Sequence, residues 1–595
     1  MPDCYSAQLP SLGAGRGRRV VTGAKKLYQS DLAQQLITSN LRYYMPHISS
    51  DILNQWQAES RTLIPQHFAE FQQLVERARS LARQRKFEAA ASYVEIAAQY
   101  AQFNHGGFFT SPELEQILIE IGRQEIPSHL YPQQQPPAGN PQRILHVSTN
   151  ISTFSGIPRM IRRWIQQDTK RSHSLALTLQ APQEVPQLLQ EAIAKSNGRI
   201  HILNQASDRI LDRARKLREC AAQADIIVTH AWEYDAVPLV AFADKDRMPP
   251  SIYTNHGDHW FWLGAGTSDV VANLRESGRY LSQHRRGIAP ERNMLLPIAL
   301  EPMHRSLSRA AAKQHLGIAP DTVLLLSIAR PPKYKTIGDI NFAQAHVPLL
   351  QEHPQAMLTI VGAGDLDEDW SEAIAQTNGR IQVLKPTDRT AEFYQAADIY
   401  VDSFPVPSTT SLLEAGSYGT PLFSRNPYPL ATCQIFGQDT PGLAGQAIEP
   451  SDLPTYLAAL SQAIADEAYR LSLGAATQHQ IAHTHWGQNW LDTLEKIYCQ
   501  AASLPRVKAA ESQTEQCLGE LDALLCSHAS LGRANFQQVA QWHLPLMPLP
   551  QRWELWLSLV ERYGWRGNQL NMLASSRWRD RYYQMRAKFA AVTGI

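Results

Sequence analysis

The sequence predicts an α/β protein with two consecutive doubly wound parallel-sheet domains, a cleft between them and helical appendages at both ends. Short apolar runs alternate with helix-like segments in two successive sets, which is the pattern of βαβ units around a buried parallel sheet. The chain has 595 residues, too many for a single hydrophobic core. Before the first set and after the second, apolar residues recur at helical spacing instead.

Composition excludes several function classes. Hydrophobic residues make up 44% and charged residues 19% of the chain, as in an ordinary folded soluble protein. The formal net charge of +1 provides no global field that would attract nucleic acid or an anionic membrane. No run reaches the roughly 18 apolar residues that span a bilayer, and no secretory h-region follows the basic N-terminus. The six cysteines are scattered without a CxxC pair, so we expect reduced thiols in a cytoplasmic protein.

The chain begins with a predicted flexible N-terminus (residues 1–30) and a helical domain (residues 31–130). Leu74, Ala78 and Leu81 recur at helical spacing, and Ser111-Pro112 has the pattern of an N-cap followed by proline at the first helical position. Residues 131–141 are polar and proline-rich, which predicts a linker.

Two strand-rich domains follow. A domain of residues 142–305 has predicted strands at Arg143–Val147, Leu175–Leu179, Ile200–Leu203, Ile226–Val228, Ile252–Tyr253 and Met294–Ile298. A domain of residues 306–483 has them at Val323–Ile328, Met357–Val361, Ile381–Leu384, Ile399–Val401 and Pro421–Phe423. In such sheets ligands bind beyond the carboxyl ends of the strands.

The remainder is predicted to be helical, with an amphipathic helix over residues 484–500 and an all-helical extension over residues 501–595. The end of the extension is rich in arginine and aromatic residues, among them Arg562, Trp565, Arg566, Trp578 and Arg586. It is either a helix packed by its aromatic side chains or a docking surface for a membrane or an anionic acceptor.

Cations and glycines follow the second set of strands. Arg330, Lys333 and Lys335 come directly after Val323–Ile328, where two or three cations suit a diphosphate; a solvated basic loop is the alternative. Gly362 and Gly364 end the next strand, consistent with a backbone that closely approaches a ligand.

Two helix starts could bind anions. Gly156 opens the helix after the first strand, where N–H groups can face an anion, although the loop is not GxGxxG. In the second domain a loop of small hydroxylated residues leads into a helix that carries Glu414; its members are Ser408, Thr409, Thr410 and Ser411. We expect their amides to hold phosphate oxygens and Glu414 to accept hydrogen bonds from the two ribose hydroxyls.

Together these residues resemble the retaining family-4 (group 1) glycosyltransferases, which have the GT-B fold of two Rossmann-like domains. The resemblance rests on Arg330 with Lys335, Val-Gly-Ala-Gly, Ala397-Asp398, and Leu413-Glu414-Ala415 with Gly419-Thr420-Pro421. It covers roughly residues 143–498 and is stronger in the second half. It implies that Arg330 and Lys335 hold the donor diphosphate and Glu414 the ribose. It also implies that residues 142–305 bind the acceptor, residues 306–483 bind the nucleotide-sugar donor, and the helix around Trp486–Tyr498 crosses back to the first domain.

One position departs from the family. Val406 stands where the family has a glutamate that contacts the donor sugar, which leaves the sugar and the stereochemistry open. The Pro-Ser-Thr-Thr loop is reminiscent of protein O-GlcNAc transferases, which also have helical N-terminal repeats.

Histidines follow two strands of the first domain. By the resemblance, His256 is the candidate catalytic histidine that positions the donor sugar and stabilises charge; a base role would suit inversion. Asp258 is a second catalytic candidate, and His230 and His259 are secondary ones. Three such residues within four positions of a loop rarely form a metal site, so none is predicted.

A basic stretch lies between strands of the first domain, where a solvated face is the default and a site for an acceptor phosphate or lipid-diphosphate headgroup the alternative. Its members are Arg275, Arg279, Arg285, Arg286 and Arg292.

The expected function is transfer of a hexose-type sugar from a nucleotide-diphosphate sugar to a hydroxyl acceptor, with retention and without a cofactor or essential metal. The acceptor would be a glycan, a lipid-linked molecule in glycan or exopolysaccharide biosynthesis, or a polypeptide, and no nucleic acid is involved. The expected location is the cytoplasm, including the inner face of the membrane. The alternatives are a protein O-glycosyltransferase, a sugar-nucleotide epimerase and an inactive nucleotide-sugar-binding scaffold.

Overall fold

The computed structural model describes residues 48–127, 141–152, 156–181, 185–338, 340–364, 369–428, 439–527, 534–564 and 573. The predicted flexible N-terminus and nearly all of the predicted linker lie outside these residues, as does the basic-aromatic C-terminal segment beyond Gly564.

The first α/β domain contains a seven-stranded sheet in which every pairing is parallel, with the order β3-β2-β1-β4-β5-β6-β7. Its strands are β1 (Arg143–Ser148), β2 (Ser172–Leu177), β3 (Ile200–Ile202), β4 (Ile226–Thr229), β5 (Ser251–Asn255), β6 (Val270–Asn273) and β7 (Asn293–Leu295). Its helices are α5 (Gly156–Gln167), α6 (Gln187–Lys195), α7 (Ile210–Ala221), α8 (Val237–Ala241) and α9 (Glu276–Arg286).

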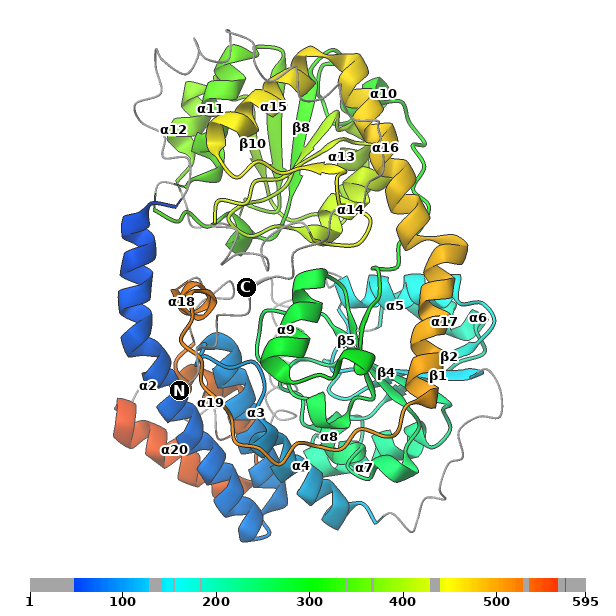
Figure 1. Ribbon diagram of the computed structural model, residues 1–595, viewed down its shortest axis with the longest axis vertical. Helices are drawn as coiled ribbons and strands as arrows, with labels where there is room; N and C mark the ends of the chain where they lie inside the picture. Colours follow the sequence, from blue (N-terminus) through cyan, green and yellow to red (C-terminus); the bar gives the residue numbers. More distant parts are fainter. Residues whose placement is uncertain are drawn as a thin grey trace, which may run out of the picture. The chain divides into compact units, whose positions relative to one another are not determined.

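The second α/β domain contains a six-stranded parallel sheet with the order β10-β9-β8-β11-β12-β13 (Figure 1). Its strands are β8 (Val323–Ile328), β9 (Ala356–Val361), β10 (Ile381–Leu384), β11 (Ile399–Val401), β12 (Leu422–Phe423) and β13 (Ala447–Ile448). Its helices are α10 (Arg309–His315), α11 (Phe342–Glu352), α12 (Ser371–Gln376), α13 (Thr390–Ala396), α14 (Thr409–Ser417), α15 (Leu453–Ala465) and α16 (Glu467–His485). The prediction of two doubly wound parallel-sheet domains is confirmed.

In both sheets the strand order reverses beside the first strand of the domain. The first strand β1 lies between β2 and β4, and β8 lies between β9 and β11. Loops after such strands diverge to opposite faces of the sheet and leave a crevice at its carboxyl edge. These loops carry Gly156 in the first domain, and Arg330 and Ser408 in the second.

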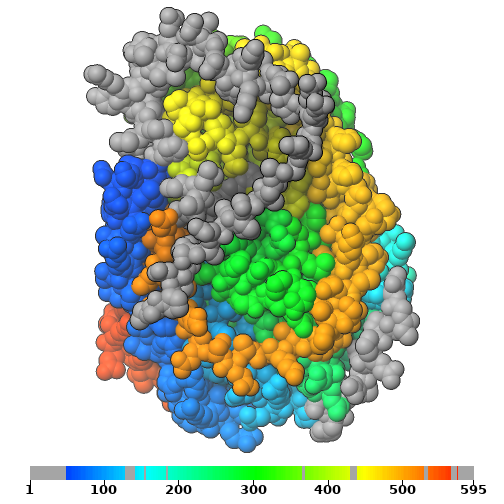
Figure 2. Space-filling model, viewed as in Figure 1, coloured from blue at the N-terminus to red at the C-terminus, as the bar shows by residue number. Residues whose placement is uncertain are grey.

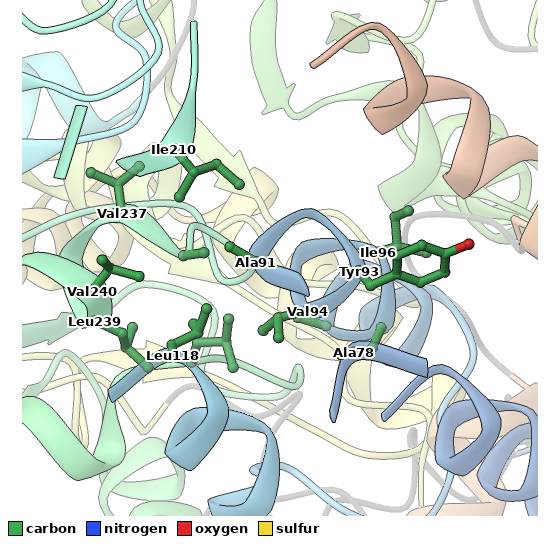
Figure 3. Packing of buried hydrophobic residues seen from close by; sticks show 14 of the residues in the cluster. Ala78, Ala91, Tyr93, Val94, Ile96, Leu118, Ile210, Val237, Leu239 and Val240 are labelled. Atoms are coloured by element: carbon green, nitrogen blue, oxygen red, sulfur yellow. The ribbon is translucent and has the colours of Figure 1, made fainter. Parts of the chain in front are cut away.

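The N-terminal helices share one hydrophobic core with the first α/β domain. They are α2 (Ser50–Arg83), α3 (Phe87–Phe103) and α4 (Pro112–Glu125). Helix α3 is buried at every position from Phe87 to Ala101, as expected of a helix with apolar residues on all sides. Figure 3 shows Val94 of α3 and Leu118 of α4 packed towards Val240 of α8.

Buried glutamates also join these helices to the first domain. Glu88 accepts hydrogen bonds from the N–H groups of Ile210 and Leu211 at the start of α7. Glu115 accepts three more, from the N–H groups of residues 264–266. Each carboxylate satisfies backbone donors that would otherwise be buried without a partner.

Two chain connections join the α/β domains, near Leu300 and near His485. The side-chain amide of Gln167 donates to both carbonyl oxygens, at 3.0 Å for Leu300 and 3.1 Å for His485. Helix α17 (Gly487–Ser503) then packs on the first sheet, and the Trp490 indole donates to the carbonyl of Pro297 at 2.8 Å. The predicted return of this helix to the first domain is confirmed.

The prediction that the C-terminal extension is helical throughout is wrong for its first part. Residues 504–519 form neither helix nor strand and run along the first domain to the N-terminal helices (Figures 1 and 2). The Val507 N–H donates to Asp269 at 2.8 Å, and the Cys517 N–H donates to the carbonyl of Gly107 at 2.9 Å. These pairings compete successfully with helix formation. Three helices follow: α18 (Glu520–Ser527), α19 (Phe536–His543) and α20 (Leu549–Tyr563).

Helix α2 reaches from the N-terminal helices to the second α/β domain. It has 34 residues, with Pro65 in its interior. Just before its start, the Ile48 N–H donates to the carbonyl of Pro427 at 3.3 Å. At its other end Phe71, Leu74 and the following apolar residues belong to the shared core.

No helix in the described part of the chain is long and apolar enough to cross a membrane. No disulfide joins cysteines in that part either. Arg562, the one described member of the basic-aromatic segment, donates to Glu70 at 2.7 Å.

Candidate functional site

Three cations follow β8 and face different surroundings. Arg330 and Lys335 are exposed, so their charges are accessible to a ligand. Lys333 is half-buried and donates to the carbonyl of Pro407 at 2.7 Å. Burial lowers the pKa of Lys333 to about 8. The loop therefore presents two accessible cations and a third that also braces the loop before α14.

The Ser408 amide is not available to a phosphate. The buried Asp402 carboxylate accepts from the N–H groups of Ser403 at 2.9 Å and Ser408 at 2.8 Å. Burial raises the pKa of Asp402 to about 6, although these N–H groups and Lys333 oppose the shift. This corrects the expectation that the Ser408 amide would hold phosphate.

The first turn of α14 has N–H groups that could still bind an anion, so this role stays a prediction. The helix begins at Thr409, so the N–H groups of Thr409, Thr410 and Ser411 have no acceptor within it. The Ser408 hydroxyl donates to the Ser411 hydroxyl at 3.2 Å.

Glu414 lies on α14 and already has partners. Its buried carboxylate accepts from Arg163 at 2.9 Å and from Arg159 at 3.2 Å, both on α5 of the first domain. Glu301 accepts from Arg163 as well, at 3.3 Å. A ribose that hydrogen-bonds to Glu414 has to share this carboxylate with Arg163 or displace Arg159, and the ribose role stays a prediction.

The two glycines after β9 permit close packing of the strand ends. Gly362 has a φ of +98°, and a Cβ there would lie 2.3 Å from the carbonyl oxygen of Ala329. A Cβ on Gly364 would lie 2.7 Å from the backbone nitrogen of Lys385. Both glycines are therefore required by the protein's own backbone, whether or not a ligand approaches them.

His256 follows β5 and is half-buried. Its Nε2 lies 3.1 Å from Nδ1 of His230. Burial lowers the pKa of His256 to about 4, so the imidazole is neutral at pH 7. His230 is completely buried and cannot contact a ligand, so its place is behind His256.

Asp258 holds its neighbours in place. Its buried carboxylate accepts two hydrogen bonds from Arg275, both at 2.8 Å, and lies 2.9 Å from Nδ1 of His259. Arg275 also lies 3.9 Å from Asp439 of the second domain. Asp258 thus positions Arg275 and His259. Burial and the nearby charge of Arg275 both lower the pKa of Lys333, and burial and the nearby charge of Lys333 both lower the pKa of His259.

The solvated face expected for the basic stretch is wrong for three of its arginines. Arg275 and Arg286 are buried, and Arg285 donates to the buried Asp522 of α18 at 2.7 Å. Arg286 donates to the carbonyl oxygens of Asp258 and Trp260. These guanidinium groups pair with internal acceptors that lie far away in sequence.

Gly156 is the exposed first residue of α5, and a Cβ there would meet nothing within 4 Å. Its helix carries Arg159 and Arg163 to Glu414, so α5 and α14 are in direct contact. Among the residues that the structure describes, no group of three His, Cys, Asp or Glu side chains could hold a metal ion.

Sequence reasoning missed the residues that join the two halves of this site. Arg163 is separated from Glu414 by 251 residues, and Asp439 from Ser277 by 162. Arginines on an amphipathic helix give no sign of which distant carboxylate they meet. The available signal in the sequence was the cluster of Arg159, Arg162 and Arg163 on one helix, which suggests acidic partners without naming them.

One family model matches part of the second domain. Residues 324–466 match the family model described as glycosyl transferases group 1. No curated protein matches the chain.

Solved structures are similar at low identity. Anabaena HepE in complex with UDP and glucose is 13% identical, with a TM-score of 0.46, over 61% of this chain and all of that one. A glycosyltransferase from Rickettsia africae is 13% identical, with a TM-score of 0.45, over 61% and 100%. An O-GlcNAc transferase from Thermobaculum terrenum is 15% identical, with a TM-score of 0.44, over 76% and 85%.

Proposed function

We propose that this chain, a glycosyltransferase whose residues 324–466 match the group 1 family, transfers a hexose-type sugar from a nucleotide-diphosphate sugar to a hydroxyl. The observation that carries the proposal is the arrangement after β8 and β11. There, accessible cations at Arg330 and Lys335 belong to the same domain edge as the unsatisfied first-turn N–H groups of α14.

The charge on a departing nucleoside diphosphate can be stabilised by these groups without a metal ion. Arg330 offers a planar pair of donors and Lys335 a point charge, while the α14 N-terminus adds its N–H groups and dipole. Such preorganised donors stabilise negative charge as it develops on the leaving group. We therefore include metal independence in the proposal.

His256 is assigned to the sugar side of the reaction. It lies at the carboxyl edge of the first sheet, is neutral, and is only half-buried. We propose that it contacts the donor sugar and that transfer proceeds with retention, as the family resemblance implies. The acceptor hydroxyl, on a glycan, a lipid-linked molecule or a polypeptide, enters from the first domain.

The donor site is tested by a thermal-shift screen of nucleoside diphosphates and their sugars, with and without EDTA. Lys335→Ala is the sharpest variant because the side chain is exposed, so its removal should not change stability. Lys195→Ala, an exposed lysine on α6, is the matched control. We expect one nucleotide to raise Tm in wild type and control, without dependence on EDTA, and to have a much smaller effect in Lys335→Ala.

Product analysis completes the test. Incubation with the best donor and candidate acceptors, followed by NMR of the anomeric proton, distinguishes retention from inversion and glycan products from glycopolypeptide. Donor binding without turnover on any acceptor class would indicate a binding scaffold. No stabilisation by any nucleotide would contradict the proposed donor site.

A further inference from the structure

Four histidines form a continuous hydrogen-bonded row across the first sheet. His173 on β2, His146 on β1, His230 after β4 and His256 after β5 lie side by side, and each consecutive pair of ring nitrogens is 3.1 Å apart. His173, His146 and His230 are completely buried. We call these four residues the histidine row.

The strand register places all four rings on one face of the sheet. His173 pairs with Ile144, two residues before His146, and His146 pairs with Val228, two residues before His230. Because side chains alternate between faces, a step of two residues per strand keeps the same face. The row therefore runs diagonally from near the start of β2 to the carboxyl edge of the sheet, where His256 lies.

The inner end of the row has only acceptors. Nε2 of His173 lies 3.1 Å from the carbonyl oxygen of Asp168 and 3.5 Å from its carboxylate. Burial of Asp168 favours the neutral acid, but the hydrogen bonds from His173 and Arg171 outweigh this and lower its pKa. Arg171 donates to Asp168 at 2.8 Å and is itself bound by Glu495 of α17. The inner end of the row thus faces a fixed acceptor, Asp168.

A fixed acceptor at one end determines every proton in a row of neutral imidazoles. A neutral imidazole has one N–H donor and one lone-pair acceptor. His173 must therefore carry its proton on Nε2, and its Nδ1 must accept from Nε2 of His146. The same step repeats at His230, whose Nδ1 accepts from Nε2 of His256.

Three rings of the row, those of His146, His230 and His256, are neutral at pH 7. Burial lowers the pKa of His146 and His230 well below the ordinary value, and that of His256 to about 4. No described residue forms a hydrogen bond with Nδ1 of His256. The row therefore leaves this nitrogen with an unshared lone pair.

We propose that His173, His146 and His230 are positioning residues that fix His256 in the Nε2–H tautomer, so that its Nδ1 accepts a hydrogen bond from a hydroxyl of the bound sugar substrate. The assignment of the ligand rests on the proposed function, whereas the tautomer is a property of the protein alone. Such a site discriminates against sugar analogues that lack the matching hydroxyl, because Nδ1 of His256 would then be left without a hydrogen bond in the complex.

The tautomer is measured on the full chain, without ligand, by imidazole 15N NMR after histidine labelling. The signal of His256 is identified by its loss in His256→Gln. We expect a protonated Nε2 and an unprotonated Nδ1 at pH 7 in wild type. A protonated Nδ1 on His256 in wild type would overturn the proposal, and this result needs no variant of the buried row.

Variants of His146 test whether the row sets this tautomer. His146→Phe removes the acceptor for Nε2 of His230, so His230 should protonate on Nδ1 and donate to Nε2 of His256, which moves the His256 proton to Nδ1. In His146→Gln the amide oxygen accepts from His230 and the amide nitrogen donates to His173, so the wild-type tautomer should be kept. An unchanged His256 tautomer in His146→Phe would overturn the proposal.

Activity provides the second readout. We expect His146→Phe to reduce turnover on the order of 100-fold with the donor KM unchanged, and His146→Gln to restore most of it. His346→Phe is the matched control, since His346 is equally buried but lies on α11 of the second domain. If nucleotide sugars fail to bind the wild type while the tautomers are as expected, the proposed function is wrong, but the inference that the histidine row fixes the tautomer of His256 still holds.

Discussion

Replacing Asp258 by asparagine should destabilise the first α/β domain strongly. The Asp258 side chain is 6% exposed, and its charge is matched by Arg275, which is 10% exposed. Asp258→Asn keeps the shape but leaves Arg275 with only Asp439, at 3.9 Å. Removing one partner of a buried ion pair costs about 3–5 kcal/mol, because the other charge stays buried. We expect a loss of this size in the free energy of unfolding.

The assay is urea denaturation followed by tryptophan fluorescence at several pH values. Burial of Asp258 favours the neutral acid, but Arg275 and His259 outweigh it, so the folded-state pKa lies below its usual range. The contribution of such a group is complete above the unfolded-state pKa of about 4 and is lost as pH falls below it. The difference between wild type and Asp258→Asn should therefore shrink as the pH is lowered from 5 to 3.

The matched control is Glu276→Gln, which removes an exposed ion pair from the same region. Glu276 and Arg279 are 2.9 Å apart with side chains 49% and 48% exposed. Exposed pairs of this kind contribute about 0–1 kcal/mol. The reasoning is refuted if Asp258→Asn costs no more than Glu276→Gln, or if its cost is the same at pH 3 as at pH 7.

Three further predictions concern other parts of the chain. Because burial lowers the pKa of Lys333 to about 8, nucleotide affinity measured by calorimetry should fall between about pH 7 and 9.5, and Lys333→Arg should remove this dependence. Asp522 pairs with His105 and Arg285, and these two outweigh burial and lower its pKa to about 2. Asp522→Asn should therefore lower the free energy of unfolding by about 3 kcal/mol and speed proteolysis of residues 504–519. Glu414→Gln should lower the free energy of unfolding, measured by urea denaturation, by about 2–3 kcal/mol; the loss is moderate because Arg163 still pairs with Glu301. A loss below about 0.5 kcal/mol would contradict the buried pairing.

Five of the six strands of the second domain could be predicted almost to the residue, because each is an apolar run bounded by polar or turn residues; β13 (Ala447–Ile448), with two residues, was missed. Val323–Ile328 and Ile381–Leu384 have the bounds predicted from the sequence. By contrast β6 (Val270–Asn273) was missed, because it has only four residues and Asp269 and Asn273 frame it as a loop. Its burial comes from neighbouring strands, which a local pattern does not reveal.

The candidate site was predictable only where its residues are adjacent in sequence. The cations after β8 and the hydroxylated loop before α14 are local patterns with a direct chemical reading. The histidine row is not, because His146 and His173 become neighbours only through strand pairing. Neither was singled out from the sequence, and the strand register gives them a common face.

The length of α2 has a mechanical consequence for any movement between the α/β domains. At 1.5 Å per residue the helix is about 50 Å long, with one end in the shared core and Ile48, just before the other, bonded to Pro427. The connections at Leu300 and His485 lie together at Gln167 and define a single hinge. A rotation about that hinge that displaced Pro427 would have to bend α2, for which Pro65 is the weakest point, or break the Ile48–Pro427 hydrogen bond, so either cost would oppose opening.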